Sequence, residues 1–502
     1  MVDILIYLIF AFPLLFTIIP LFTKKYAKLI STVLSGLFLL FILYIFIIKY
    51  DQTVIYTLFS LSNGISFDVI LNYFTLPLLL LVALVIFIAI SYQDKNIENS
   101  YFSYVFFLEF SLIGVFLSYN LVFFYVFWEL VLIPSYFMLG RWGGPRKDYT
   151  SLKFLIYTHV GSVFMLISIF IIGFYSNSNF SYSVLSNVKN IPGPLIPIVL
   201  LGFFLAFFIK LPSFPFHSWA PDVYVESPTT SSMIFSGLLS KMGAFGIFVI
   251  FINKNGIGSL LPSWVGILLI ILGITSIVYS ALVALAQKDL KRMVAYASIG
   301  HMGFITLSAG VFLYIAPLSQ YMNGIRLVLT GGMFMIFAHG IIIPILFGSV
   351  GSVERSTGTR SMNDLGGITK MMPNLAFIMV GGFLASLGLP GFAGFISEFS
   401  VVIGSWIVLQ YWSFVLIFGM VVVASYHIWA LQKTLFGPYN NYLGKISDML
   451  LNELWPMLLL LIIAFILGIY PYPIYHLFYN YSNILIGDHL FYNYSNILIG
   501  GA

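Results

Sequence analysis

The sequence predicts an all-α protein that crosses a membrane about fourteen times. Charged residues make up only 8% of the 502-residue chain, and hydrophobic residues make up 60%. A soluble globular domain carries roughly 25% charged residues. The few basic residues, which give a net charge of +5, are scattered over short loops. The composition therefore excludes a soluble enzyme, a disordered protein and a nucleic-acid-binding protein.

Apolar stretches long enough to span a bilayer, about 20 residues each, follow one another along the chain. We predict spans at residues 2–22, 29–48, 69–92, 101–119, 120–140, 152–175, 194–219, 229–253, 262–286, 292–315, 325–349, 371–408, 411–436 and 453–475. The longest intervening loops, 49–68, 176–193 and 350–370, are too short to fold alone.

The distribution of Lys and Arg predicts the orientation. When the loops are assigned to alternate sides, most basic residues share one side with Lys24, Arg146 and Lys291. The positive-inside rule places that side in the cytoplasm or the mitochondrial matrix and both termini on the opposite side.

Two spans contain helix breakers in matching positions. Pro212 and Pro215 follow Lys210 in the seventh span, and Pro390 interrupts the twelfth span shortly before Glu398. Irregular backbone is tolerated at membrane depth only where protein buries it or water reaches it. Since the breaks lie five spans apart, helices 4–8 and 9–13 are predicted to be inverted repeats.

This reading divides the chain into four parts. Residues 1–100 hold the first three helices, 101–253 the first repeat, 262–436 the second repeat, and 437–502 helix 14 and a tail. The tail contains HLFYNYSNILIG twice, at 476–487 and 489–500, which we interpret as a duplication without function.

Ionisable residues lie in the middle of several predicted spans, where each charge costs about 2.5–3.5 kcal/mol. Such residues are functional or paired, and six of them predict a polar line through the protein: Glu129, Lys210, Lys241, His301, His339 and Glu398. Glu109 could join this line or hydrogen-bond to a neighbouring helix. His217, together with Asp222 and Glu226, could form a proton entry mouth or a polar loop. His159 and His427 are interpreted as structural histidines.

Glu129 and Lys210 suggest a proton switch. At 4 Å and an effective dielectric constant near 20, a carboxylate attracts an ammonium group by about 4 kcal/mol. This attraction would hold the proton on Lys210 against desolvation, and movement of Glu129 would release it.

No local motif for a redox or nucleotide cofactor is found in the sequence. Cysteine is absent, which excludes thiolate zinc sites and cysteine-ligated iron–sulfur clusters. There is also neither a GxGxxG fingerprint after a strand nor a P-loop. The energy for transport is therefore expected from a partner or from an ion gradient.

Four segments resemble the antiporter-like membrane subunits of respiratory complex I. They are the run from Lys210 to Gly246, KLPSFPFHSWAPDVYVESPTTSSMIFSGLLSKMGAFG, together with WEL at 128–130, KRMVAYASIGHMGF at 291–304 and LGLPGFAGFISEF at 387–399. Glu398 in helix 12 and the short chain after helix 14 resemble the M type, which includes subunit 4 of the mitochondrial enzyme.

The resemblance implies specific roles for the polar line. Glu129 and Lys210 would form the switch pair, Lys241 the bridging lysine and Glu398 the terminal group, with His301 and His339 between them. It also implies proton transfer from matrix to intermembrane space across the mitochondrial inner membrane. The heavy use of Phe and Tyr, whose codons are AT-rich, agrees with an organellar gene.

The resemblance further implies that this chain binds no cofactor itself. NADH, FMN, iron–sulfur clusters and ubiquinone would be used by partner subunits of the complex. The expected partners are neighbouring antiporter-like and accessory subunits and membrane lipids, such as cardiolipin near Lys24, Lys25 and Lys28.

Three alternatives remain open. A subunit of an Mrp-type cation/proton antiporter shares the same helices and lysines, and a subunit of the plastid relative of complex I shares the same motifs. A structural scaffold with a decayed channel is disfavoured, because Glu129, Lys210, Lys241 and Glu398 are all present.

Overall fold

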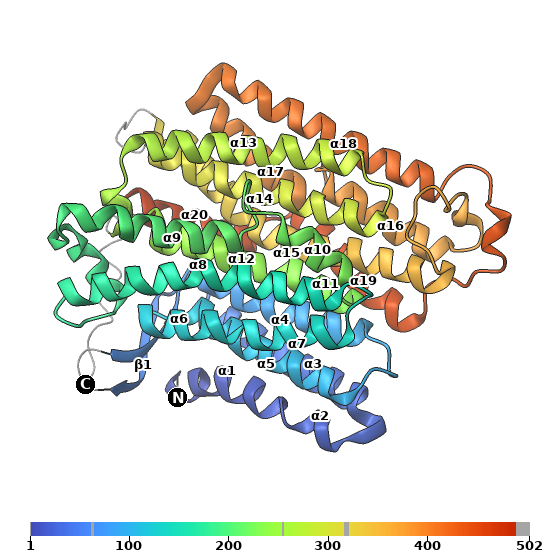
Figure 1. Cartoon of the computed structure of the whole chain (residues 1–502), viewed down its shortest axis with the longest axis horizontal. Helices are drawn as coiled ribbons and strands as arrows, with labels where there is room; N and C mark the ends of the chain where they lie inside the picture. Colours follow the sequence, from blue (N-terminus) through green and yellow to red (C-terminus); the bar gives the residue numbers. More distant parts are fainter. Residues whose placement is uncertain (1, 62–64, 254–255, 316–320, 488–502) are drawn as a thin grey trace.

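A computed structural model describes residues 2–61, 65–253, 256–315 and 321–487. The helices lie side by side, with α1 to α3 along one edge and α13 and α18 along the other (Figure 1). Thirteen segments of the described chain are long and apolar enough to cross a membrane. One of them, Ala393–Thr434, contains two helices, α17 and α18. The predicted all-α polytopic fold is therefore confirmed.

The elements follow the predicted spans closely. The first part holds α1 (Val2–Phe16), α2 (Ile19–Phe22), α3 (Ala27–Ile48), β1 (Val54–Leu61), β2 (Ile65–Leu71) and α4 (Thr75–Tyr92). The next holds α5 (Asn99–Leu117), α6 (Leu121–Leu130), α7 (Leu132–Trp142), α8 (Lys147–Tyr175), α9 (Ile196–Lys210), α10 (Trp219–Glu226), α11 (Thr229–Ile234) and α12 (Ser240–Gly246). The remainder holds α13 (Ser263–Leu285), α14 (Leu290–Ile315), α15 (Met322–Thr357), α16 (Pro373–Ser386), α17 (Ala393–Leu409), α18 (Phe414–Thr434), α19 (Leu451–Ile469) and α20 (Tyr472–Ile486).

The two predicted helix breaks are present. In the seventh span, α9 ends at Lys210 and α10 begins at Trp219; in the twelfth, α16 ends at Ser386 and α17 begins at Ala393. The eighth span carries two π-helical turns, Phe235–Leu239 and Ile247–Phe251, on either side of α12. Such turns are often found at functional sites. The relation of the two halves by inversion stays a prediction.

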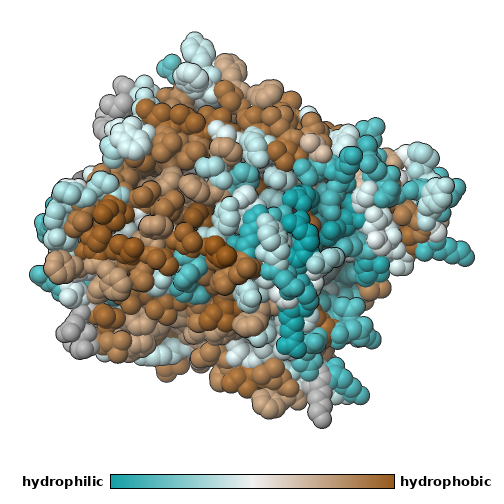
Figure 2. Space-filling model, in the orientation of Figure 1, coloured by the Kyte–Doolittle hydropathy of each residue, from teal (hydrophilic) through white to brown (hydrophobic). Residues whose placement is uncertain are grey.

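The core of the bundle surrounds α15. Every residue of its most apolar stretch is buried, and it packs against α4, α14, α16, α17, α19 and α20. Apolar side chains cover the middle of the face shown in Figure 2, and hydrophilic ones gather at the end near α10 and α16. This separation agrees with helices that expose an apolar band to lipid.

A β-hairpin occupies the segment predicted as loop 49–68 and the start of the third span. β1 pairs antiparallel with β2, from Val54 opposite Leu71 to Leu61 opposite Ile65, and α4 begins only at Thr75. The predicted helix start at residue 69 is therefore wrong. The error arises because the apolar end of β2 continues without a charge into the apolar start of α4, so hydropathy alone cannot separate them.

The first copy of the C-terminal duplication is a packed helix. In α20, Phe478 and Tyr481 place their rings 5.6 and 4.9 Å from the ring of Phe74, and α20 contacts α15 along its length. The second copy, at 489–500, lies outside the described residues. A repeated segment thus contributes to the core in its first occurrence.

A buried ion pair joins α15 to the start of α19. The Glu453 carboxylate accepts hydrogen bonds from Arg355 at 2.6 and 3.0 Å, and from the Ser352 hydroxyl at 3.1 Å. It also accepts one from the Leu450 backbone N–H at 3.0 Å. Because Glu453 is buried, water cannot replace its carboxylate as the acceptor for these four donors.

We predict that Glu453→Ala lowers the free energy of unfolding by roughly 1.5–3 kcal/mol, the range for hydrogen bonds to a charged group. The matched control is Glu354→Ala on α15, the helix that carries Arg355. Glu354 is more exposed and meets Arg360 at 3.4 Å, so its loss should cost less than about 1 kcal/mol. Denaturant unfolding in detergent micelles measures both, and equal losses would contradict the assignment.

Candidate functional site

The break in the seventh span places Lys210 inside the protein. The Trp219 indole N–H donates to the Ile209 carbonyl at 2.9 Å, which satisfies a backbone group that the break would otherwise leave unpaired. Ser276 Oγ accepts a hydrogen bond from the Phe214 backbone N–H at 3.0 Å. The irregular backbone is therefore held by protein groups, as its depth in the membrane requires.

The Lys210 ammonium group is surrounded by aromatic rings. Nζ lies 5.3 Å from the ring centre of Phe154 and 5.9 Å from that of Trp128. It has no hydrogen-bond partner among the described residues. Aromatic faces attract a cation but cannot accept its hydrogen-bonding protons as an oxygen would. Lys210 is thus a buried amino group without a hydrogen-bond acceptor among the described residues.

Glu129 is not paired with Lys210. Its Oε2 lies 3.1 Å from Nδ1 of His159, while Oε1 is buried without a hydrogen-bond partner. Glu129 is the second-last residue of α6 and faces α8, whereas Lys210 ends α9 among aromatic rings. The predicted contact between Glu129 and Lys210 is therefore open in this structure.

His159 was the residue that sequence reasoning set aside. We predicted a core histidine, but 54% of its side chain is exposed and its partner is Glu129, a residue of the predicted polar line. The sequence contains one usable signal, the placement of His159 and Glu129 near the middle of successive spans. Nothing in the sequence gave the rotation of the two helices.

Lys241 is at the centre of a second, fully buried cluster. Its Nζ lies 2.9 Å from the Ser236 carbonyl oxygen, 3.1 Å from Ser240 Oγ and 2.5 Å from Nδ1 of His339. His339 Nε2 in turn lies 3.0 Å from Ser298 Oγ. When the ammonium donates to Nδ1, a neutral ring carries its hydrogen on Nε2 and donates it to Ser298.

His301 and Glu398 continue this cluster at the second break. The ring of His301 lies 5.4 Å from that of His339, and its Nε2 is 3.0 Å from the Ser386 carbonyl oxygen and 3.5 Å from Glu398 Oε1. A small cavity between the two rings is lined by Ser386 and Gly394 as well. It has room for about one water molecule.

The six predicted residues thus fall into two sets. Lys241, His339, His301 and Glu398 lie next to one another in the interior, with a small cavity between the two histidine rings, whereas Glu129 and Lys210 lie apart from them and do not contact each other. The backbones of the two sets meet at Gly243, where an added Cβ would lie 2.6 Å from the Leu211 backbone nitrogen. Only glycine lets α12 approach α9 this closely, so Lys210 and Lys241 are carried by directly packed helices.

Glu109 and His217, for which the sequence allows either a functional or a structural role, lie in different surroundings. Glu109 is fully buried and neither carboxyl oxygen has a hydrogen-bond partner among the described residues. His217 packs its ring 5.2 Å from Tyr279 and 5.7 Å from Phe214. The structure brings neither into hydrogen-bond contact with the two groups.

Two further polar features are structural. The Asp222 carboxylate bridges Lys153 at 2.7 Å and Arg292 at 3.0 Å, and so ties α10 to α8 and α14. His427 Nε2 forms a hydrogen bond of 3.0 Å with the Ser386 hydroxyl, and the carbonyl oxygen of the same residue contacts His301. Within the described residues, no group of three or more His, Asp or Glu side chains could hold a metal ion.

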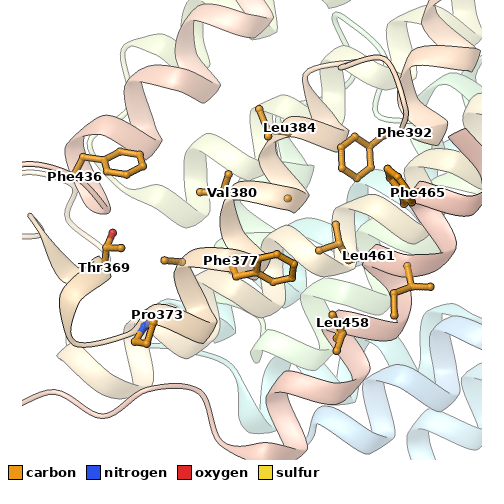
Figure 3. Close-up of a pocket in the computed structure, with 13 residues that line it drawn as sticks. Thr369, Pro373, Phe377, Val380, Leu384, Phe392, Phe436, Leu458, Leu461 and Phe465 are labelled. Carbon is orange, nitrogen blue, oxygen red and sulfur yellow. The ribbon is translucent and has the colours of Figure 1, made fainter. Parts of the chain in front are cut away.

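An apolar groove of about 670 Å³ flanks the break in the twelfth span. Figure 3 shows its lining, in which Phe392, at the end of the break, lies beside Phe465 of α19, and Leu384 and Leu461 line other parts of the groove. None of its lining residues is ionisable. The groove therefore adds no titratable side chain to the two sets of ionisable residues.

The sequence matches a family model described as "NADH:quinone oxidoreductase/Mrp antiporter, TM" over residues 118–424. Subunit M of the F(420)H(2) dehydrogenase of Methanosarcina mazei is 37% identical over 84% of each chain. Subunit M of the NADH-quinone oxidoreductase of Rickettsia prowazekii is 34% identical over 74% of each.

Solved structures show the same fold. A chain of respiratory complex I from Thermus thermophilus matches with a TM-score of 0.83 and 27% identity, over 96% of this chain and 99% of that one. A chain of the Mrp complex from Dietzia matches with a TM-score of 0.85 at 18% identity, over the whole of both, which shows the fold alone. The broken helices, the buried lysines and these similarities lead to one conclusion: the chain belongs to the NADH:quinone oxidoreductase/Mrp antiporter family of membrane subunits.

Proposed function

We propose that this chain is the M-type, proton-translocating subunit in the membrane arm of a respiratory NADH:quinone oxidoreductase. The observation that carries the proposal is the buried connection from Lys241 through His339 and His301 to Glu398. The subunit M relatives named above and the complex I chain support the type of complex. NADH, FMN, iron–sulfur clusters and ubiquinone would be bound by partner subunits.

The geometry supports proton transfer along this connection. A hydrogen bond from Lys241 to His339 needs no rearrangement to pass a proton, because donor and acceptor are already in contact. His339 and His301 are separated by a space that holds about one water, and among the described residues Nδ1 of His301 has no hydrogen-bond partner. Glu398 then accepts the proton at the far end. The protein supplies a series of titratable groups, and movements elsewhere in the complex can change which of these groups holds a proton.

A second candidate is supported by a specific observation. The relative with 37% identity is a subunit of an F(420)H(2) dehydrogenase, so a deazaflavin rather than NADH could feed electrons to the partner subunits. The mitochondrial inner membrane, the matrix-to-intermembrane-space direction and the sides of the termini stay predictions. The relatives that we describe are bacterial and archaeal.

The experiment that tests the proposal separates a mildly solubilised membrane on a native gel and assays the bands for oxidation of NADH and of reduced F420. Mass spectrometry then identifies the band that contains this chain. Co-migration with NADH:quinone activity is expected. Co-migration with F420-dependent activity selects the second candidate, and a smaller assembly with cation-driven proton flux overturns both.

We predict that Lys241→Met lowers redox-driven proton pumping at least about tenfold, because it removes the donor at the centre of the cluster. Dye quenching in inside-out vesicles measures the pumping at matched complex content. Glu98→Gln is the matched control, since this exposed residue pairs with Arg141 and Ser100 at the surface and should leave pumping within about twofold. Unchanged pumping in Lys241→Met would contradict the role.

We predict that His301→Phe also lowers pumping at least about tenfold, because it interrupts the contact between His339 and Glu398. His427→Phe is the comparison: it contacts the same Ser386 but not Glu398, and should lower pumping by at most about twofold. Equal effects of the two substitutions would mean that packing around Ser386, rather than proton transfer through His301, is what the residues provide.

A further inference from the structure

One ionisable pair of the site reaches the molecular surface. His159 and Glu129 meet at 3.1 Å, and 54% of the His159 side chain and 24% of the Glu129 side chain are exposed. By contrast Lys210, Lys241, His339, His301 and Glu398 are all buried. The pair lies at the rim of a hollow of about 560 Å³ on the outer face of α6, α7 and α8.

The hollow gives the Glu129 carboxylate room to move. Besides Glu129 and His159, its lining includes Tyr125, Val126, Ile133, Tyr136, Phe137 and Leu155. The titratable groups that face it are therefore the carboxylate, the imidazole and two phenols. The Tyr125 phenol faces the hollow from a position four residues before Glu129 on α6. Within the described residues no Lys or Arg side chain lines the hollow.

Lys210 lies on the inner side of the same carboxylate. Its ammonium group is without a hydrogen-bond partner, and so is Glu129 Oε1. Trp128, the neighbour of Glu129 on α6, supplies one of the rings over Lys210. The carboxylate thus sits between an imidazole that it contacts and an ammonium group that it does not.

We propose that His159 is a positioning residue that competes with Lys210 for the Glu129 carboxylate. This inference rests on the proposed function and assigns His159 the control of the contact between Glu129 and Lys210. With the carboxylate on His159, Lys210 loses its counter-charge and its buried ammonium is destabilised. With the carboxylate on Lys210, the proton is retained. His159 itself neither receives the transported proton nor contacts Lys210.

The energies of the two positions are comparable enough for exchange. In one position the carboxylate contacts the His159 ring nitrogen and the Lys210 ammonium is left without it. In the other it contacts Lys210 and the His159 nitrogen is left without it. At the effective dielectric constant of such sites, moving a carboxylate a few ångströms changes its attraction to an ammonium by a few kcal/mol. A hydrogen bond to a charged group is worth about 1.5–3 kcal/mol, so His159 can offset that change.

The test uses the intact complex and three variants. His159→Phe keeps an aromatic ring but removes the nitrogen, and His159→Asn keeps a polar nitrogen at a similar distance from the backbone. Val160→Phe is the matched control, since Val160 is an exposed neighbour on α8 that does not line the hollow. For each, the structure of the assembled complex and the number of protons pumped per electron are measured.

In His159→Phe the Glu129 carboxylate is expected within 4 Å of Lys210 Nζ, with the pumping ratio lowered at least about fivefold. His159→Asn should keep the carboxylate outside and retain at least about half of the ratio, and Val160→Phe should match the parent. A carboxylate that stays away from Lys210 in His159→Phe, or an Asn variant as defective as Phe, overturns the inference. Since the distance is read without activity, a parent complex that pumps no protons would overturn the proposed function alone.

Discussion

The cost of an ionisable group in a low-dielectric interior governs this structure. Each such group at the membrane centre costs about 2.5–3.5 kcal/mol even on gentle scales. The chain offsets this cost in three ways. Lys241 receives two oxygens and a ring nitrogen, Lys210 receives aromatic faces, and Glu129 is moved toward the surface onto His159. These three solutions make the groups differ in how readily each holds a proton.

The broken helices are a consequence of the same constraint. A continuous helix hides its backbone groups, so polar atoms become available at depth only where it stops. At the second break, the Ser386 carbonyl ends α16 and lies 3.0 Å from His301 Nε2. At the first, the proline-rich segment after Lys210 is held by Trp219 and Ser276. The breaks thus place backbone oxygens and ionisable side chains together, which an unbroken bundle cannot do.

The sequence was sufficient for the helices, the two breaks and the burial of five of the six residues of the polar line, because each depends on local composition along the chain. It was insufficient wherever the result depends on how helices are rotated about their axes. The contact of Lys241 with His339 joins residues 98 positions apart, and the pair of His159 with Glu129 depends on α6 and α8 presenting particular faces. The hairpin was missed for a different reason, since no charged residue separates the apolar end of β2 from the apolar helix α4.

The two groups of ionisable residues differ in what can influence them. Lys241, His339, His301 and Glu398 are enclosed by protein, so a neighbouring subunit or lipid can affect their protons only by moving helices. Glu129 and His159 lie where an adjoining molecule can touch them directly. Desolvating an exposed carboxylate strengthens its attraction to any nearby cation, and the nearest buried ammonium on its inner side is Lys210. Covering the hollow would therefore change the competition between His159 and Lys210 without any movement in the enclosed group. The exposed pair is the part of the site that a molecule outside the protein can reach, and the proposed competition would convert such a contact into a change of charge at Lys210.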